Sequence, residues 1–330
     1  MHKHIIAFMG LIWLIVSQAY TQPCTGKTIA DIDVSRQRIV RAYYDNDYFV
    51  GTNQYYTQGV RLELIHPQFK NLFISKNLLL RIGQRATTYY GLGISHALYT
   101  PVDLQSAEIV PGDRPYAGNF TLNHFLISNE RDREMRLTTQ IELGFLGPLA
   151  GGGLIVRATE NPDSPQGWNN QIKTDFILGY QALFEKGFLS INGIDLVGQL
   201  SASASTRYTY FGVGGLLRIG MLNPYFYELH FTKRSIYGQR DIKATQIYLY
   251  ARPQAQFVAY DATLQGGLLN RSSPYAIAGS DLKRVRPKVE IGLDIIVGRV
   301  GLGLSFNWEG GKFDGATAHK WGQIKLMVGL

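Results

Sequence analysis

Cysteine is almost absent from this chain, because Cys24 is the only one in 330 residues. No disulfide can form within the chain, so other interactions must stabilise an exported protein of this length. Long apolar runs are also scarce. Beyond residues 5–16 the sequence has no stretch of about 18 apolar residues, which excludes a membrane protein built from spanning helices.

The N-terminal residues have the pattern of an export signal. A basic start at Met1–His4 precedes the apolar run 5–16, and Ser17–Ala19 supplies small residues that a signal peptidase recognises. The apolar run is too short to span a bilayer as a helix. We therefore predict a cleaved signal peptide at residues 1–19 and an N-terminal periplasmic segment at residues 20–37.

A net charge of +8 is spread along the sequence without a basic run. This dispersion argues against nucleic acid as a partner, and a positive surface can instead meet anionic lipid head groups. The chain has 20 tyrosines, 16 phenylalanines, 4 tryptophans and 36 glycines. Aromatic side chains at the membrane interfaces and glycines in tightly curved sheets are typical of a membrane barrel.

Apolar and polar residues alternate in many segments of the chain. Between Val300 and Trp308, apolar residues occupy every second position, and glycine, serine and asparagine lie between them. Other segments carry charged residues on the second face, which suits a polar lumen with the apolar face turned to lipid. This periodicity predicts twelve strands. They span residues 38–48, 56–66, 78–89, 116–128, 134–146, 171–184, 188–200, 206–220, 244–260, 286–298, 300–310 and 320–330.

These segments predict an all-β fold, a transmembrane antiparallel β-barrel of about 12 strands in the bacterial outer membrane, spanning residues 38–330. An even number of strands places both termini in the periplasm and the first loop outside the cell. The long connections that then face the exterior are 90–115, 147–170 and 261–285. In the second long loop, Asp113 and Arg114 are expected to form an ion pair. A soluble sandwich of short strands is the main alternative fold.

Two polar residues lie close to the first loop. If both flanking segments are strands, side chains repeat every two residues, so Asp47 and Thr57 fall on the polar, lumen-facing sides of adjacent strands. A carboxylate and a hydroxyl that converge beside a loop form a candidate site. In the alternative interpretation Asp47 pairs with Arg41 or Arg61. Thr57 is then an ordinary strand residue, since threonine favours strands.

Four short motifs occur in order in the first half of the chain. They are Asn46-Asp47-Tyr48-Phe49, Tyr56-Thr57-Gln58-Gly59, Leu98-Tyr99-Thr100-Pro101-Val102-Asp103 and Gly112-Asp113-Arg114-Pro115-Tyr116-Ala117-Gly118. A weaker pair, Gly147-Pro148 and residues 165–168, brackets the third long loop. With these motifs the chain resembles the family of outer-membrane lipid A 3′-O-deacylases. The resemblance implies a twelve-stranded barrel that hydrolyses an acyl ester of lipid A at its extracellular mouth, using calcium.

The resemblance also implies roles for particular residues. Asn46, Asp47 and Thr57 match residues of the family's site. Asp47 would help to hold the calcium ion, directly or through water, while Asn46 and Thr57 order the surroundings. Glu160 or Asp163 would supply the acidic ligand from the third long loop. Calcium prefers oxygen ligands, and it can polarise an ester carbonyl and stabilise the oxyanion that forms there.

The third long loop departs from the family's pattern. The family places a histidine there as general base, yet this chain has none between Gly151 and Trp168. Three explanations follow. In the first, His96 or His319 supplies the base from the extracellular end of its strand. In the second, Glu160 is the base, which a carboxylate can be if its pKa is raised. In the third, the protein has lost hydrolysis and kept binding.

Two functions therefore compete. One is an esterase that removes an acyl chain from lipid A, with lipopolysaccharide as its substrate. The other is a non-catalytic barrel, either a binding remnant or a small channel. A phospholipase-type esterase would need a serine or threonine activated by histidine, and the sequence shows no such arrangement.

Overall fold

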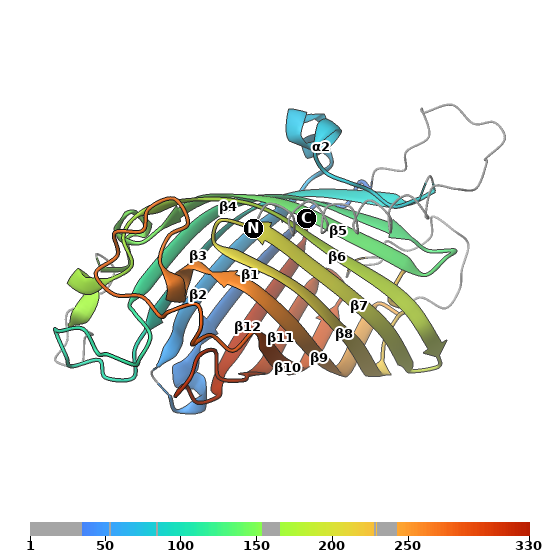
Figure 1. Cartoon of the computed structure of the whole chain (residues 1–330). Helices are drawn as coiled ribbons and strands as arrows, with labels where there is room; N and C mark the ends of the chain where they lie inside the picture. The colour runs from blue at the N-terminus through green and yellow to red at the C-terminus, as the bar shows by residue number, and fades with distance from the viewer. Residues whose placement is uncertain (1–34, 53, 84, 154–165, 228, 230–242) are drawn as a thin grey trace.

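Within the residues described, twelve antiparallel strands close into a barrel (Figure 1). The structure is a computed structural model, and it describes residues 35–52, 54–83, 85–153, 166–227, 229 and 243–330. The predicted signal peptide, residues 1–19, lies outside them.

The fold class predicted from the sequence is confirmed. The strands are β1 (Ile39–Asn46), β2 (Tyr55–Ile65), β3 (Thr87–Thr100), β4 (Ala117–Glu130), β5 (Met135–Leu146), β6 (Asp175–Ile191), β7 (Ile194–Ser205), β8 (Tyr208–Met221), β9 (Thr245–Asp261), β10 (Val285–Val297), β11 (Val300–Glu309) and β12 (His319–Gly329).

Short helical turns occupy parts of the connections. They are η1 (Asp47–Val50), η2 (Pro67–Asn71), α2 (Phe73–Asn77), η3 (Pro148–Ala150), η4 (Gly167–Asn170) and α4 (Ala262–Gln265). In the described part of the chain, none of the helices combines the length and the apolar character needed to cross a membrane.

The first and the last strand start and finish at the same end of the barrel. The backbone N–H of Leu330 donates to the carbonyl of Arg38 at 2.8 Å, and every residue of β1 has a partner in β12. We call this end the terminal end and the opposite one the loop end. In our prediction the terminal end faces the periplasm and the loop end faces outward. The loop end carries the connections 47–54, 101–116, 147–174, 262–284 and 310–318.

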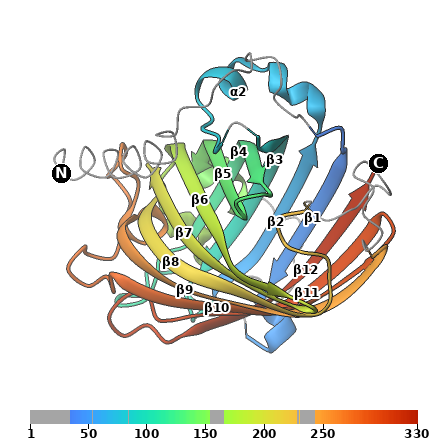
Figure 2. The ribbon, with the colours of Figure 1, turned by 90° about the vertical axis from the view of Figure 1, so that its right-hand side faces the viewer.

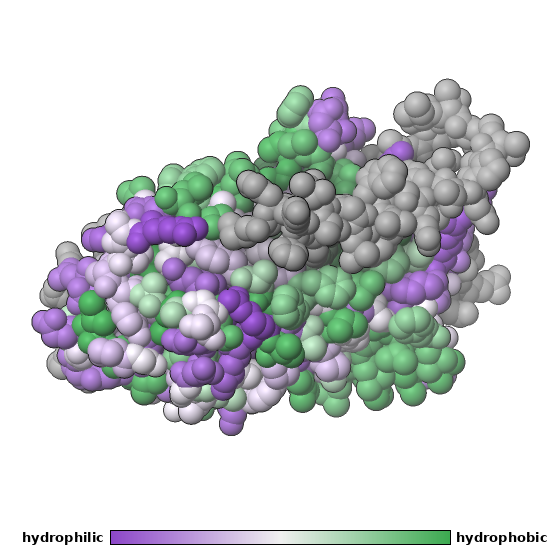
Figure 3. All heavy atoms as spheres, viewed as in Figure 1, coloured by the Kyte–Doolittle hydropathy of each residue, from purple (hydrophilic) through white to green (hydrophobic). Residues whose placement is uncertain are grey.

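The two faces of the strands differ in chemistry, as their alternation predicts. Val60 and Leu62 of β2 are exposed on the outer surface, whereas Arg61 and Glu63 line the lumen. Figure 3 shows apolar residues gathered over the wall of the barrel. Inside, charged side chains on different strands form ion pairs. Examples are Arg41–Glu63 at 2.7 Å, Arg252–Glu290 at 2.9 Å and Lys325–Asp294 at 2.9 Å.

The third strand differs from its prediction. The sequence pattern predicts a strand at 78–89, but β3 runs from Thr87 to Thr100. The apolar run that suggested a strand instead packs on the outside of the barrel, where Leu79 contacts Tyr90 and Leu126. Periodicity does not distinguish these two environments, because short apolar runs are buried in both. The loop after β3 is therefore shorter than predicted.

The hairpin between β6 and β7 also lies further along the chain than predicted. The sequence pattern predicts a turn at 185–187, but β6 continues to Ile191 and the turn comes at 192–193. Glu185 is the first residue of the predicted turn. It points into the lumen instead, where the side-chain amide of Gln199 donates to it at 2.8 Å. A polar lumen accepts charges in mid-strand, so charge is a poor turn signal here.

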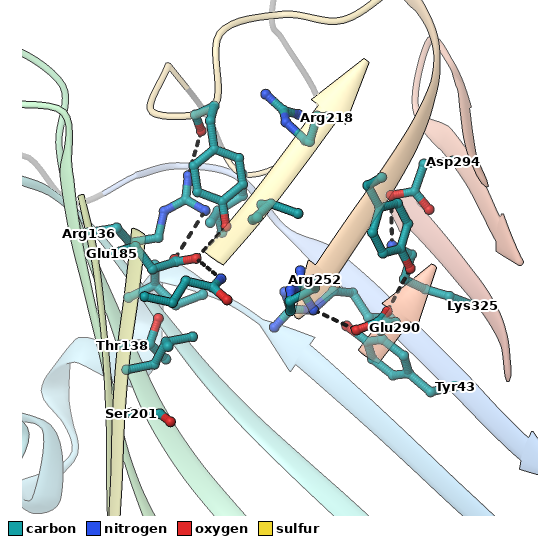
Figure 4. A pocket seen from close by; sticks show the side chains of 18 of the residues that line it. Tyr43, Arg136, Thr138, Glu185, Ser201, Arg218, Arg252, Glu290, Asp294 and Lys325 are labelled. Carbon is teal, nitrogen blue, oxygen red and sulfur yellow. Dashed lines mark hydrogen bonds and ion pairs between the residues drawn. The ribbon is translucent and has the colours of Figure 1, made fainter. Parts of the chain in front are cut away.

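The segment of residues 222–227, which follows β8, folds into the barrel at the terminal end (Figure 2). Residues 223–225 line a cavity of about 610 Å³ in the lumen. Arg136 donates to the carbonyl of Tyr225 at 2.7 Å, and the hydroxyl of Tyr225 donates to Glu185 at 2.7 Å. Figure 4 shows Arg136 and Glu185 together on one side of this cavity. The segment therefore obstructs the lumen at the terminal end.

This obstruction predicts that the native barrel conducts ions poorly. Tyr225→Ala removes the hydroxyl that binds Glu185 and the ring that lies 4.3 Å from the Arg136 guanidinium. We expect the variant to show resolvable current steps in planar bilayers, because the segment loses its attachment in the lumen. Tyr275→Ala, at the loop end, is the matched control and should keep the native current. An unchanged current in Tyr225→Ala would mean that other lumen side chains close the passage.

Candidate functional site

The chain turns sharply at the loop end of β1. Asn46 caps η1, because its Oδ1 accepts a hydrogen bond from the backbone N–H of Tyr48 at 2.8 Å. The Nδ2 of Asn46 donates to the Tyr44 hydroxyl at 2.8 Å. Asp47 is therefore the first residue of a turn and not, as predicted, a strand residue on the lumen face. Asn46 shapes the turn that carries Asp47.

The carboxylate of Asp47 is buried, with only 1% of the residue exposed. Its Oδ2 accepts the backbone N–H of Gln54 at 2.6 Å, and its Oδ1 has no hydrogen-bond partner among the described residues. The alternative ion pair with Arg41 or Arg61 is not formed, since both guanidiniums contact Glu63 instead. Burial raises the pKa of Asp47 to about 7. A bound cation would lower that pKa and satisfy the free oxygen.

The return of the chain into β2 is strained. Tyr55 has a φ of 61°, a conformation that costs a non-glycine residue about 1–3 kcal/mol. Gln54, directly before it, donates its N–H to Asp47. Tyr56, directly after it, accepts a hydrogen bond from His319 at its carbonyl, at 3.1 Å. The strain therefore lies between the two backbone groups that hold Asp47 and His319.

A bulge in β2 changes the face on which Thr57 lies. The pairing with β3 shifts between Tyr56 and Gln58, so Thr57 has no partner of its own in the ladder. Its hydroxyl is 2.9 Å from the hydroxyl of Thr100. Alternation along β3 places Thr100 on the outer face, together with the exposed Ile94. The predicted lumen position of Thr57 is wrong, because a bulge breaks the period of two.

The described ends of the third long loop lie against this outer face. A Cβ added at Gly152 would be 2.7 Å from the ring of Trp168 and 2.8 Å from Leu98. Trp168 packs against Tyr116, with 5.1 Å between the ring centres, and both side chains are buried with Leu98. Leu98 is two residues from Thr100 on the same face of β3. This part of the loop therefore covers the outer wall beside the Thr57–Thr100 pair.

His96 shares this outer face. Its Nε2 is 2.8 Å from the carbonyl oxygen of Ala150 in the third loop. A carbonyl only accepts, so this nitrogen carries the proton and Nδ1 has the free electron pair. Four residues separate His96 from Thr100, which is roughly 13 Å along a strand. The structure thus places His96 on the same face as the Thr57–Thr100 pair but at a distance from it.

His319 is the first residue of β12, at the rim of the barrel. Alternation along β12 groups it with Lys325, which lines the lumen cavity. Its Nε2 donates to the carbonyl of Tyr56, so Nδ1 has the free electron pair. This Nδ1 is buried and has no hydrogen-bond partner among the residues described. The ring stacks on Trp321, with 5.4 Å between centres, and is held beside the backbone of Thr57.

Calcium would take about six to eight oxygen ligands. The free Oδ1 of Asp47 fits one of these positions, because it is a buried carboxylate oxygen without a partner. The described residues contain no group of three or more His, Cys, Asp and Glu that could hold a metal. The predicted ligands Glu160 and Asp163 lie outside the described residues. Their roles, and the alternative role of Glu160 as base, stay predictions.

Arg114 is a buried residue near the loop end whose surroundings the sequence analysis did not predict. The expected ion pair with Asp113 is wrong, since the Asp113 carboxylate accepts the backbone N–H groups of Val102 and Arg114, each at 2.6 Å. The guanidinium of Arg114 lies 4.4 Å from the centre of the Tyr99 ring. It also donates to the hydroxyl of Thr263 at 3.2 Å. In the sequence, only its place in the fourth motif pointed to a role for Arg114 in the site.

Comparison with solved structures finds the same architecture in LpxR from Salmonella typhimurium. The TM-score is 0.67 at 17% sequence identity, over 88% of this chain and 99% of that one. The β domain of the Bordetella autotransporter BrkA gives a TM-score of 0.45 at 11% identity, over 89% and 99% of the two chains. The translocator domain of the autotransporter NalP from Neisseria meningitidis gives 0.39 at 9% identity, over 98% and 95%.

The likeness to the Salmonella protein is evidence for the fold alone, and the two autotransporter domains are too distant to add to it. A search of curated protein sequences finds no match. The model of one protein family, described as outer membrane protein LpxR, matches residues 7–330. This match covers nearly the whole chain and agrees with the closed barrel of twelve strands. The chain is therefore an outer-membrane β-barrel that belongs to the LpxR family.

Proposed function

We propose that this protein hydrolyses an acyl ester of lipid A where its loop end meets the outer leaflet of the outer membrane. Family membership supports the reaction, and the outward-facing Thr57–Thr100 pair beneath the third loop carries the proposal. Exposed apolar residues such as Val60 and Ile94 continue the same outer wall. An acyl chain can lie along this wall, whereas charged and polar side chains line the lumen and would disfavour it.

In this proposal the turn after β1 is the cation site. Asp47 contributes its free Oδ1 as a ligand, and Asn46 keeps the turn in place as the cap of η1. Calcium, when bound, supplies positive charge that polarises the ester carbonyl. The Thr57 hydroxyl pairs with Thr100 and can turn to donate a hydrogen bond to the substrate. Glu160 or Asp163 would supply a further ligand from the third loop.

For the general base we propose His319. Its Nδ1 has a free electron pair, and its Nε2 is bound to the carbonyl next to Thr57. The His319 ring lies 5.8 Å from the ring of Tyr55, in the stretch that leads from the turn carrying Asp47 into β2. Nδ1 takes a proton from water as the water oxygen bonds to the ester carbon, and the proton is then given to the departing alcohol oxygen. The products are a fatty acid and a lipid A hydroxyl.

The first test is a mass spectrum of lipid A from cells that express the protein. Native protein with calcium should reduce the mass of lipid A by one acyl chain. Asp47→Asn keeps the size of the side chain but removes its charge, and we expect activity to fall by about 10²-fold or more. Asp281→Asn, in another connection at the loop end, is the matched control and should stay active. Full activity of Asp47→Asn would remove Asp47 from the mechanism.

The second test separates the two histidines. His319→Gln should lower the rate by about 10²–10⁴-fold, because it removes the proposed base while keeping a group that can donate to Tyr56. His96→Gln should change the rate far less. Heat-modifiable migration on gels would confirm that both variants are folded. A large loss in His96→Gln with an active His319→Gln would transfer the role to His96.

A non-catalytic barrel that binds lipopolysaccharide is the second candidate. The absence of a histidine between Gly151 and Trp168 favours it, since the family's base belongs in that loop. An unchanged lipid A spectrum from cells with correctly folded native protein would support binding without hydrolysis. The small channel is less favoured, because residues 223–225 fold into the lumen.

A further inference from the structure

The connection between β2 and β3 is long for the terminal end, and it folds back on the outside of the barrel. The turns 131–134, 192–193 and 298–299 at that end are short. This connection, residues 66–86, contains η2 and α2 and lies over the outer wall of β4–β6 (Figures 1 and 2). We call it the outer strap.

Polar side chains of the barrel wall fasten the outer strap. Thr139 of β5 donates to the carbonyl of Leu80 at 2.9 Å, and the N–H of Leu80 donates to the Tyr180 hydroxyl of β6 at 3.2 Å. The Ser128 hydroxyl of β4 accepts the N–H of Ile82 at 3.0 Å and donates to its carbonyl at 2.9 Å. These wall positions would otherwise face lipid with unpaired polar groups. The strap is therefore a fixed part of the fold.

The side of the strap that faces away from the barrel is apolar. Phe73 is 74% exposed, although its helix packs through the neighbouring Ile74 against the wall. Three further leucines of the strap, Leu72, Leu78 and Leu80, are also exposed. In Figure 3 the strap shows apolar residues beside a hydrophilic tip. Such a surface is stable in contact with acyl chains and costly in water.

The strap also carries positive charge without any negative charge. Its sequence contains Lys70, Lys76, Arg81 and Arg85 and no Asp or Glu. Lys70 and Lys76 are exposed and flank the apolar residues Leu72 and Phe73. Long lysine side chains next to an apolar surface can reach from the edge of the hydrocarbon to the head groups. Apolar insertion together with local positive charge is the pattern of a segment that lies in an anionic membrane interface.

We propose that the outer strap is a binding site for anionic phospholipid head groups in the periplasmic leaflet of the outer membrane. Phe73 and its neighbouring leucines lie among the acyl chains, and Lys70 and Lys76 bind the phosphate of the lipid. The lipid is thereby held against the outer wall of β4–β6, at the opposite end of the barrel from the candidate active site. This role is independent of lipid A hydrolysis.

Native mass spectrometry of the whole protein in neutral detergent tests the proposal, with phosphatidylglycerol and phosphatidylcholine as probes at low salt. Native protein should retain phosphatidylglycerol in preference to phosphatidylcholine. The double variant Lys70→Gln/Lys76→Gln should bind phosphatidylglycerol about 30-fold more weakly, since each surface cation near an anionic lipid contributes about fivefold. Lys173→Gln/Lys283→Gln removes two exposed lysines at the loop end and should bind as the native protein does.

A second variant separates charge from apolar contact. Phe73→Ser keeps both lysines, and it should weaken retention of phosphatidylglycerol while preserving the preference over phosphatidylcholine. Equal retention of the two lipids by native protein, or native affinity in Lys70→Gln/Lys76→Gln, would overturn the proposal. Release of phosphatidylglycerol by millimolar inorganic phosphate would also overturn it, because the site would then recognise a free anion. Heat-modifiable migration shows that each variant is folded, so every comparison is made between intact barrels.

Discussion

Every backbone N–H and C=O group that enters a membrane must find a partner within the protein, and this barrel is one solution to that requirement. All of β1 pairs with β12, so the sheet has no free edge. Closure then creates two environments on a single strand, which is why Leu62 faces lipid and Arg61 the lumen. The outer strap obeys the same requirement outside the sheet, since wall hydroxyls satisfy its backbone groups at Leu80 and Ile82.

The inner and outer faces of the barrel wall have different roles in this protein. Inside, carboxylates and guanidiniums pair with one another, as Arg41 does with Glu63, and the segment bearing Tyr225 is tied into that network. Buried pairs of this kind add little net stability compared with apolar packing, but breaking one partner is costly, so they fix a single arrangement. Outside, the Thr57–Thr100 pair lies on the outer face near the loop end, and the strap lies on the outer wall at the terminal end. The functions proposed here therefore belong to the outer surface and its rim, and the interior supports them.

The sequence was sufficient for the fold class, since alternation of apolar and polar residues directly reflects a wall with lipid on one side. It was insufficient wherever the period of two is interrupted. Leu79 packs on the barrel from outside, and nothing in the pattern of residues 78–82 separates that from a strand. Asp47 lies near the predicted loop, but its burial depends on Gln54 and the strained Tyr55, which local propensity does not reveal. His319 lies beside Tyr56 only because the barrel closes. The two residues are 263 positions apart in the chain.

The bulge at Thr57 makes the direction of a side chain depend on the number of residues before it. The ladder between β2 and β3 resumes its regular count at Gln58, with one residue left over. A chain with that residue deleted could keep a threonine in the aligned column and yet present it to the water-filled interior instead of the bilayer. The number of residues between the turn and this position therefore decides the face on which the threonine lies. A sequence alignment that matches residue types alone does not reveal it.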